Sequence, residues 1–148
     1  MRILFAFKIG ALEVAYVKAV VESKALHVYA TVKFLVDTGA TRTTISDKDA
    51  IRLGIDYLTL EKVSKGMLGI GGPVDAYILK DARLIFNQED RKKHIEPIES
   101  LCFLKHSEVN ERILRIPSIL GRDVLNKYAL IYDKRQEKAY LTDELKRI

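Results

Sequence analysis

An aspartate, a hydroxyl residue and a glycine follow one another at the end of an apolar stretch, as Asp37-Thr38-Gly39. Burial at the end of a strand raises the pKa of a carboxyl group, whereas hydrogen bonds to its charged form lower that pKa. A turn of this composition can do both, which makes it a setting for catalysis. The same triplet is common in ordinary turns, where the aspartate accepts an Asx hydrogen bond, so the triplet alone leaves both interpretations open.

The elements around the triplet are a strand and a short helix. Residues of Val28–Val36 alternate between two faces, and period two over this length predicts a strand that delivers the aspartate into the turn. Farther along, Ser46 is a suitable N-cap, Asp49 completes an approximate capping box and Gly54 is a suitable C-cap. These signals predict a helix over Asp47–Leu53.

Short strands account for most of the remaining chain. A strand, a glycine-rich turn and a second strand are expected over residues 60–86, followed by a polar loop over 87–96 and a strand over 98–104. Residues 109–117 are ambiguous. In the last part of the chain we expect a short strand at residues 118–121 and one or two helical turns at 122–128. Two further strands, at 129–132 and 138–141, are expected to form a hairpin with a charged turn. No domain boundary stands out, so we expect one mainly β domain with short helices over residues 1–148.

Three segments of the sequence come in the order and spacing of a known family. Residues 35–41 resemble the active-site motif of the retropepsins, the single-domain aspartic proteases of retroviruses and their cellular relatives. Residues 119–125 resemble their second signature, an apolar strand leading into Gly-Arg-Asp and a helix, and residues 69–72 are similar to their glycine-rich flap tip. The resemblance covers roughly residues 28–141 and implies a retropepsin-like closed β-barrel, the acid-protease fold, with short helices.

The resemblance also implies roles for the matching residues. Asp37 corresponds to the catalytic aspartate, Thr38 to the residue that braces the paired active-site loops across a dimer, and Gly39 to a position where backbone passes close by. Gly121 and Arg122 correspond to the floor beneath the active-site loop. The flap tip and a side-chain pocket complete the implied substrate-binding set, which is Ala40, Gly69, Ile70, Gly71 and Ile119.

One position departs from the retroviral pattern. In the retroviral enzymes an acidic residue shortly after the triplet pairs with the arginine of the second signature and binds substrate backbone, whereas Thr41 and Arg42 stand here. The sequence therefore leaves the partner of Arg122 open. We also expect the contacts to substrate backbone to differ from those of the retroviral enzymes.

Aspartic proteolysis needs two carboxylates, and the chain supplies one Asp-Thr-Gly. Two adjacent carboxylates share one proton, as is established for the aspartic proteases. One acts as a base toward water and the other donates a proton to the scissile carbonyl oxygen, without a covalent intermediate. A two-fold dimer brings in the second carboxylate from an identical surface. The sequence therefore predicts an aspartic endopeptidase that cleaves polypeptides as a homodimer and uses no cofactor or metal.

Two other functions remain open at this point. The pattern Asp37-x-Gly39-x-Thr41 also resembles the phosphate-binding hairpin of actin-like sugar and acetate kinases, although those enzymes are much longer and no second phosphate motif is present. A retropepsin-like domain can also serve as an inactive dimerisation or peptide-binding module. The intact Asp-Thr-Gly triplet argues against such a loss of activity.

Composition and charge argue against several other classes. The 148 residues carry a formal net charge of +5, but basic side chains are interleaved with acidic ones, so we expect no nucleic-acid partner. One cysteine allows no intrachain disulfide, and three scattered histidines give no zinc spacing. No apolar run is long enough to cross a membrane, and Lys8 interrupts the apolar start of the chain. We expect a cytoplasmic protein with no membrane partner.

Overall fold

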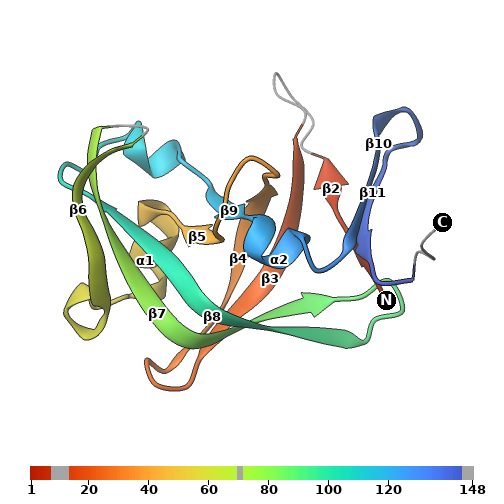
Figure 1. Cartoon of the computed structure of the whole chain (residues 1–148), viewed down its shortest axis with the longest axis horizontal. Coiled ribbons are helices and arrows are strands. Elements are labelled where there is room, and N and C mark those ends of the chain that lie inside the picture. The colour runs from red at the N-terminus through yellow and green to blue at the C-terminus, as the bar shows by residue number, and fades with distance from the viewer. Residues whose placement is uncertain (8–13, 70–71, 145–148) are drawn as a thin grey trace.

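The computed structural model describes residues 1–7, 14–69 and 72–144, and its architecture is a closed β-barrel with a small additional sheet (Figure 1). Strands pair in the order β2-β3-β4-β9-β5-β8-β7-β6, and a further pairing of β3 with β7 closes the ring. The strands of this sheet are β2 (Ala6–Phe7), β3 (Ala15–Ser23), β4 (Val28–Val36), β5 (Thr44–Ile45), β6 (Glu61–Gly69), β7 (Gly72–Asn87), β8 (Lys93–His106) and β9 (Ser118–Leu120). The predicted closed, mainly β fold is confirmed.

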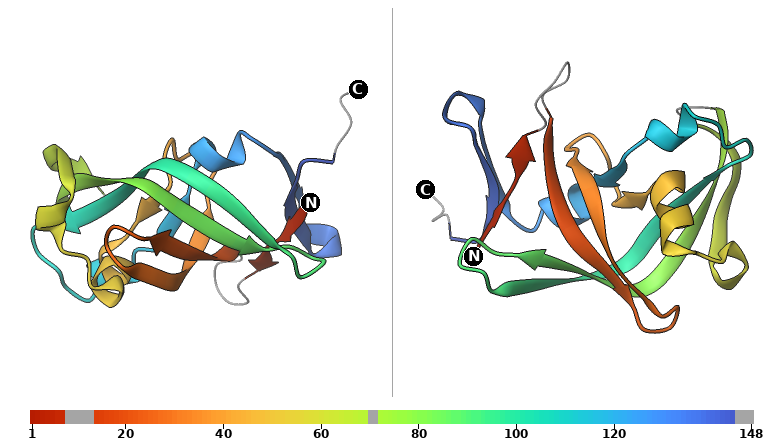
Figure 2. Two further views of the ribbon diagram at one scale, coloured as in Figure 1. Left: turned by 90° about the horizontal axis from the view of Figure 1, so that it is seen from below. Right: turned by 180° about the vertical axis from the view of Figure 1, so that it is seen from behind.

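A second, three-stranded sheet brings the two ends of the chain together. It has the order β1-β11-β10, and we call it the terminal sheet. Its strands are β1 (Arg2–Leu4), β10 (Ala129–Asp133) and β11 (Lys138–Thr142). Figure 2 shows this sheet beside the barrel, with the β10–β11 hairpin extending past the barrel wall. The predicted C-terminal hairpin is confirmed, and its charged turn contains a short 3-10 helix, Lys134–Gln136.

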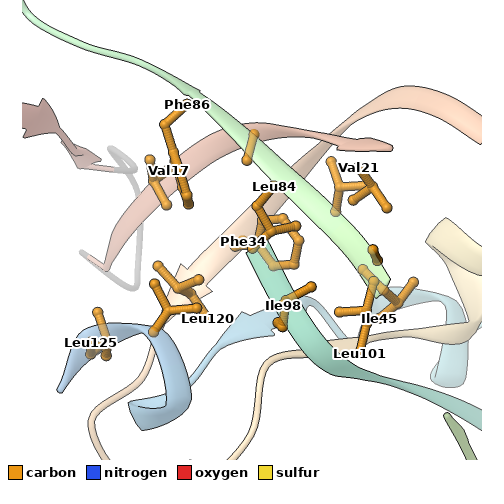
Figure 3. Packing of buried hydrophobic residues seen from close by; sticks show 14 of the residues in the cluster. Val17, Val21, Phe34, Ile45, Leu84, Phe86, Ile98, Leu101, Leu120 and Leu125 are labelled. Atoms are coloured by element: carbon orange, nitrogen blue, oxygen red, sulfur yellow. The ribbon is translucent and has the colours of Figure 1, made fainter. Parts of the chain in front are cut away.

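Buried and exposed residues alternate along β4, and this alternation shows which face of the strand lines the core. Val28, Val32 and Phe34 are buried, whereas the intervening Tyr29 and Lys33 are exposed. One face of the strand therefore points inward along its whole length. Figure 3 shows the result: apolar side chains from several strands meet inside the barrel, among them Val21, Phe34, Ile45, Leu84, Leu101 and Leu120.

The helices lie between strands near the loop that follows β4. Helix α1 covers Asp47–Leu53, as predicted, and ends at Gly54, whose left-handed backbone (φ 68°) glycine adopts without strain. Helix α2 covers Arg122–Leu125, and two further 3-10 helices cover Tyr57–Thr59 and Ile113–Arg115. None of the helices in the described ranges is long and apolar enough to cross a membrane.

Two local predictions are confirmed only in part, because contacts between residues distant in sequence dominate. Ser46 precedes α1 but its side chain makes no capping hydrogen bond; Ser46 and Asp49 instead bond to Ser118, 72 and 69 residues away. The predicted polar loop over residues 87–96 is only half as long, residues 88–92, because β7 runs to Asn87 and β8 already begins at Lys93. Its polar residue Glu96 is buried against partners from outside the hairpin, which a local pattern cannot reveal.

Candidate active site

Asp37 stands directly after β4, at the point where the barrel wall turns into a loop. Its backbone N–H donates to the carbonyl oxygen of Leu120 in β9 at 3.1 Å, which continues the parallel pairing of β4 with β9. Its Oδ1 accepts a hydrogen bond of 2.8 Å from the N–H of Gly39. This is the Asx bond expected of an ordinary turn, and it also holds the carboxylate in one orientation. The Asp37 side chain stays half-buried.

Gly39 and Gly121 both stand where a side chain would meet other atoms. A Cβ on Gly39 would lie 3.1 Å from Asp37 Oδ1. A Cβ on Gly121 would lie 2.6 Å from the carbonyl carbon and oxygen of Arg42, a distance that real Cβ atoms do not tolerate. The close approach of Gly121 lets the start of α2 pack directly against the loop that carries the catalytic candidate.

Backbone hydrogen bonds join the same two segments. The N–H of Arg122 donates to the carbonyl oxygen of Ala40 at 2.8 Å, and the N–H of Asp123 donates to that of Thr41 at 3.2 Å. Together with the bond from Asp37 to Leu120, these contacts fix the loop over residues 37–43, which we call the Asp37 loop, against β9 and α2.

The side chain of Arg122 also bonds from α2 to the Asp37 loop. Its Nη1 donates to the carbonyl oxygen of Thr38 at 2.9 Å, and its Nη2 donates to Thr41 Oγ1 at 3.3 Å. No ion pair of Arg122 is found within the described part of the chain. The partners of Arg122, which the sequence left open, are thus the backbone carbonyl of Thr38 and the hydroxyl of Thr41.

The innermost contact of the loop was not expected from the sequence. Thr43 is fully buried, and its Oγ1 donates to Asp123 Oδ1 at 2.7 Å while accepting from the N–H of Gly121 at 3.1 Å. The Thr43 N–H also lies 3.0 Å from both carboxylate oxygens of Asp123. The one available signal was that Asp123 belongs to the second signature yet had no assigned role.

A hollow of about 400 Å³ opens beside Asp37 and Thr38. Its remaining lining is apolar or aromatic and comes from the strand ends and the terminal sheet: Phe5, Ala15, Val36, Leu130 and Tyr132. Tyr132 is 55% exposed, and its ring meets that of Phe7 edge-on at 5.6 Å. The structure therefore brings β10 next to the catalytic candidate, which the sequence did not predict.

The predicted substrate-binding residues are placed in part. Ile119 is half-buried in β9, opposite Leu35 of β4 and Thr44 of β5. Gly69 pairs with Gly72 at the described end of the β6–β7 hairpin, while Ile70 and Gly71 lie outside the described residues. Figures 1 and 2 show that this end of the hairpin, the Asp37 loop and the β10–β11 hairpin all extend toward the same side of the molecule.

Other chemistry finds less support in the described part of the chain. The residues from Asp37 to Thr41 do not form a hairpin, and Thr41 Oγ1 accepts a hydrogen bond from Arg122, so the phosphate-binding interpretation fails. Over the described ranges, no group of three or more histidine, cysteine, aspartate or glutamate side chains is arranged to hold a metal ion.

Comparison with known proteins shows which family the chain resembles. Residues 27–88 match the family described as "gag-polyprotein putative aspartyl protease". No curated protein matches the chain. A retropepsin-like aspartic protease from Rickettsia conorii shares the fold, with a TM-score of 0.60 and 19% identity over 95% of this chain and 89% of that one.

Two other solved structures are more distant. The EIAV protease in complex with the inhibitor HBY-793 aligns with a TM-score of 0.45 and 15% identity, over 81% of this chain and 92% of that one. The retroviral protease-like domain of Ddi1 from Leishmania major aligns with a TM-score of 0.49 and 13% identity, over 87% of this chain and 97% of that one. The chain is therefore similar to the retropepsin-like aspartic proteases, through the matched segment that contains Asp37-Thr38-Gly39 and through the fold that it shares with the Rickettsia conorii enzyme.

Proposed function

We propose that the protein is an aspartic endopeptidase that is active as a homodimer, with the two Asp37 carboxylates activating one water molecule. The observation that carries this proposal is the attachment of the Asp37 loop to β9 and α2 through Arg122, Thr43 and Gly121. An ordinary surface turn has no need of so many buried or long-range bonds. A catalytic carboxylate does need them, because its position must be held closely for the reaction.

The chemistry requires two carboxylates in different protonation states. One Asp37 carboxylate, ionised, removes a proton from water as that water attacks the scissile carbonyl carbon. The other, protonated, donates its proton to the carbonyl oxygen, which gives a neutral tetrahedral gem-diol. Breakdown of this species then needs a proton on the leaving nitrogen, which the carboxyl group that took up the first proton supplies. Each chain contributes one carboxylate to this exchange, so the site is incomplete without the second copy.

The surface beside Asp37 supports an association of two copies. The hollow next to Asp37 and Thr38 has apolar walls, and Leu130 and Tyr132 border it from β10. In the described part of the terminal sheet, β10 pairs with β11 alone and forms an edge of that sheet. A second copy related by a two-fold axis near Asp37 would cover this apolar surface. Thr38, exposed at the same place, would then meet its symmetry mate.

A peptide is the proposed substrate, bound between the Asp37 loop and the β6–β7 hairpin. Ala40 and Ile119 would contact it from the barrel, and Gly69, Ile70 and Gly71 would contact it from the hairpin, which would act as a flap. Closure of such a flap excludes water and positions the scissile bond.

Cleavage of an unfolded protein substrate tests the proposal directly. The wild-type protein should cleave it and an aspartic-protease inhibitor should block the cleavage, whereas Asp37→Asn should be folded, dimeric and inactive. Asp90→Asn, in the exposed turn between β7 and β8, is a matched control that should keep full activity. A folded wild-type dimer without activity would instead support the inactive-module interpretation, and undiminished cleavage by Asp37→Asn would exclude Asp37 as the catalytic group.

A further inference from the structure

Strand β8 ends in a histidine whose ring lies against a buried carboxylate. His106 Nδ1 lies 2.5 Å from Asp47 Oδ2, and the His106 backbone N–H donates to Asp47 Oδ1 at 3.0 Å. Both side chains are only 3% exposed. Because burying two such groups costs much of what their attraction returns, a pair of this kind adds little net stability to a fold. Its location is therefore more informative than its strength.

His106 lies at the root of the β6–β7 hairpin. It pairs with Val74 of β7, and the next residue, Ser107, donates its N–H to the carbonyl oxygen of Pro73 at 3.4 Å. Beyond Pro73, the described partner of the β7 arm belongs to β6, where Gly72 pairs with Gly69. The end of β8 is thus the last part of the barrel wall that holds the outgoing arm of the hairpin.

Asp47 contacts His106 from the first turn of α1, and the same turn also contacts strand β9. Two residues after Asp47, the carboxylate of Asp49 accepts a hydrogen bond of 2.6 Å from Ser118 Oγ. Ser118 directly precedes Ile119, the proposed wall of the substrate cleft. Two buried acidic residues on one helical turn therefore connect the hairpin root to the β9 wall.

A second contact holds the same region after the helix. The Tyr57 hydroxyl donates to the carbonyl oxygen of Leu104 in β8 at 3.0 Å, and its ring meets Tyr77 of β7 edge-on at 4.9 Å. Burial, together with the nearby charge of Asp47, raises the pKa of the Tyr57 phenol. The segment from α1 to Tyr57 thus contacts both β7 and β8 near the base of the β6–β7 hairpin.

We propose that Asp47 and His106 are positioning residues, which fix the root of the β6–β7 hairpin relative to β9 so that the hairpin is ready to close over a peptide. This inference rests on the proposed peptidase function. If the pair is lost, the hairpin occupies its binding-ready position for a smaller fraction of the time. The apparent substrate affinity then falls in proportion to that fraction, whereas the rate at saturation changes little.

The strand offers its own matched control. His94, near the opposite end of β8, also bonds to a buried carboxylate: its Nε2 lies 3.1 Å from Glu96 Oε2 and 2.8 Å from the Tyr128 hydroxyl. This cluster faces the segment after α2 rather than the hairpin. Substitution of either histidine removes a histidine–carboxylate contact from the same strand, but only His106 lies beside the hairpin root.

The experiment compares His106→Ala, His106→Asn and His94→Ala by steady-state kinetics on a peptide and by hydrogen exchange of residues 73–78, well below the melting temperature of each. His106→Ala should raise KM by about fivefold to tenfold, leave kcat within about twofold and speed exchange in residues 73–78. His106→Asn keeps an N–H donor near the Nδ1 position and should largely restore both values. His94→Ala should leave KM and this exchange unchanged.

The outcomes separate the positioning role from the proposed function. Wild-type KM and wild-type exchange in His106→Ala, or equal changes in His94→Ala, would overturn the positioning role while peptidase activity stands. An inactive wild-type protein would overturn the proposed function, and the exchange comparison would still decide whether the pair holds the hairpin. If His106→Ala does not fold, Asp47→Asn, which keeps the volume but loses the charge, provides the same comparison with a smaller expected change.

Discussion

The contact between Thr43 and Asp123 allows a quantitative test of how the Asp37 loop is held. Thr43→Val keeps the shape of the buried side chain but removes the hydroxyl that bonds to Asp123 Oδ1 and to the Gly121 N–H. Losing a hydrogen bond to a carboxylate and leaving the buried Gly121 N–H without this partner should together cost about 2–4 kcal/mol in the free energy of unfolding. For a chain of this size the melting temperature should fall by roughly 5–15 °C.

The neighbouring residue supplies the control for this substitution. Thr44 Oγ1 donates to the carbonyl oxygen of Arg42 at 3.2 Å in a more exposed position, so Thr44→Val should cost less than about 1 kcal/mol. Thr43→Ser keeps the hydroxyl and should lie close to the wild type. Melting must be compared at one protein concentration, because the proposed dimerisation would stabilise the folded chain. Equal melting temperatures for Thr43→Val and Thr44→Val would refute the argument that Thr43 anchors the loop.

Three further predictions follow from the described contacts. Gly121→Ala places a Cβ 2.6 Å from the Arg42 backbone, so it should destabilise the fold by roughly 3 kcal/mol or more and abolish activity, as measured by melting and cleavage; a stable, active variant would contradict it. Burial opposes ionisation of Glu96, but hydrogen bonds from its partners outweigh this and hold its pKa below the ordinary 4.5; the partners are Lys127, Tyr128 and His94. The stability this group contributes is therefore present above its unfolded-state pKa and lost as the pH falls through the lower folded-state value, so Glu96→Gln should flatten the acid limb of melting temperature against pH. Cleavage should follow a bell-shaped pH profile with an acidic optimum, because the Asp37 pair must hold one shared proton, and a rate that keeps rising into alkaline pH with the protein folded would point to other chemistry.

Local sequence signals predicted the elements that depend on local physics. The alternation of Val28–Val36 identified β4 because one face of the strand is buried, and Gly54 marked the end of α1 because that position needs a left-handed backbone. The Asp37-Thr38-Gly39 triplet and the Gly121-Arg122 pair were recognised as motifs, and the structure brings them into contact.

The remaining contacts could not be predicted, because they join residues far apart in sequence. Thr43 and Asp123 are 80 residues apart, and no periodicity records that they meet. Ser46 resembled a helix cap by its type and position, yet its hydroxyl lies against that of Ser118 in strand β9. Polar residues at the start of β8 suggested a loop, since nothing local shows that Glu96 is buried among partners from the segment after α2.

Mixing wild-type and Asp37→Asn subunits tests the central claim, a catalytic site shared by two copies of the chain, most directly. The subunits are exchanged by dilution and reconcentration at a fixed total concentration, and cleavage is measured against the wild-type fraction. If each site needs an Asp37 from both chains, activity falls as the square of that fraction, to about a quarter in an equal mixture, because mixed dimers are inactive. A linear decrease, to about half, would mean that each chain works alone and would contradict the shared site.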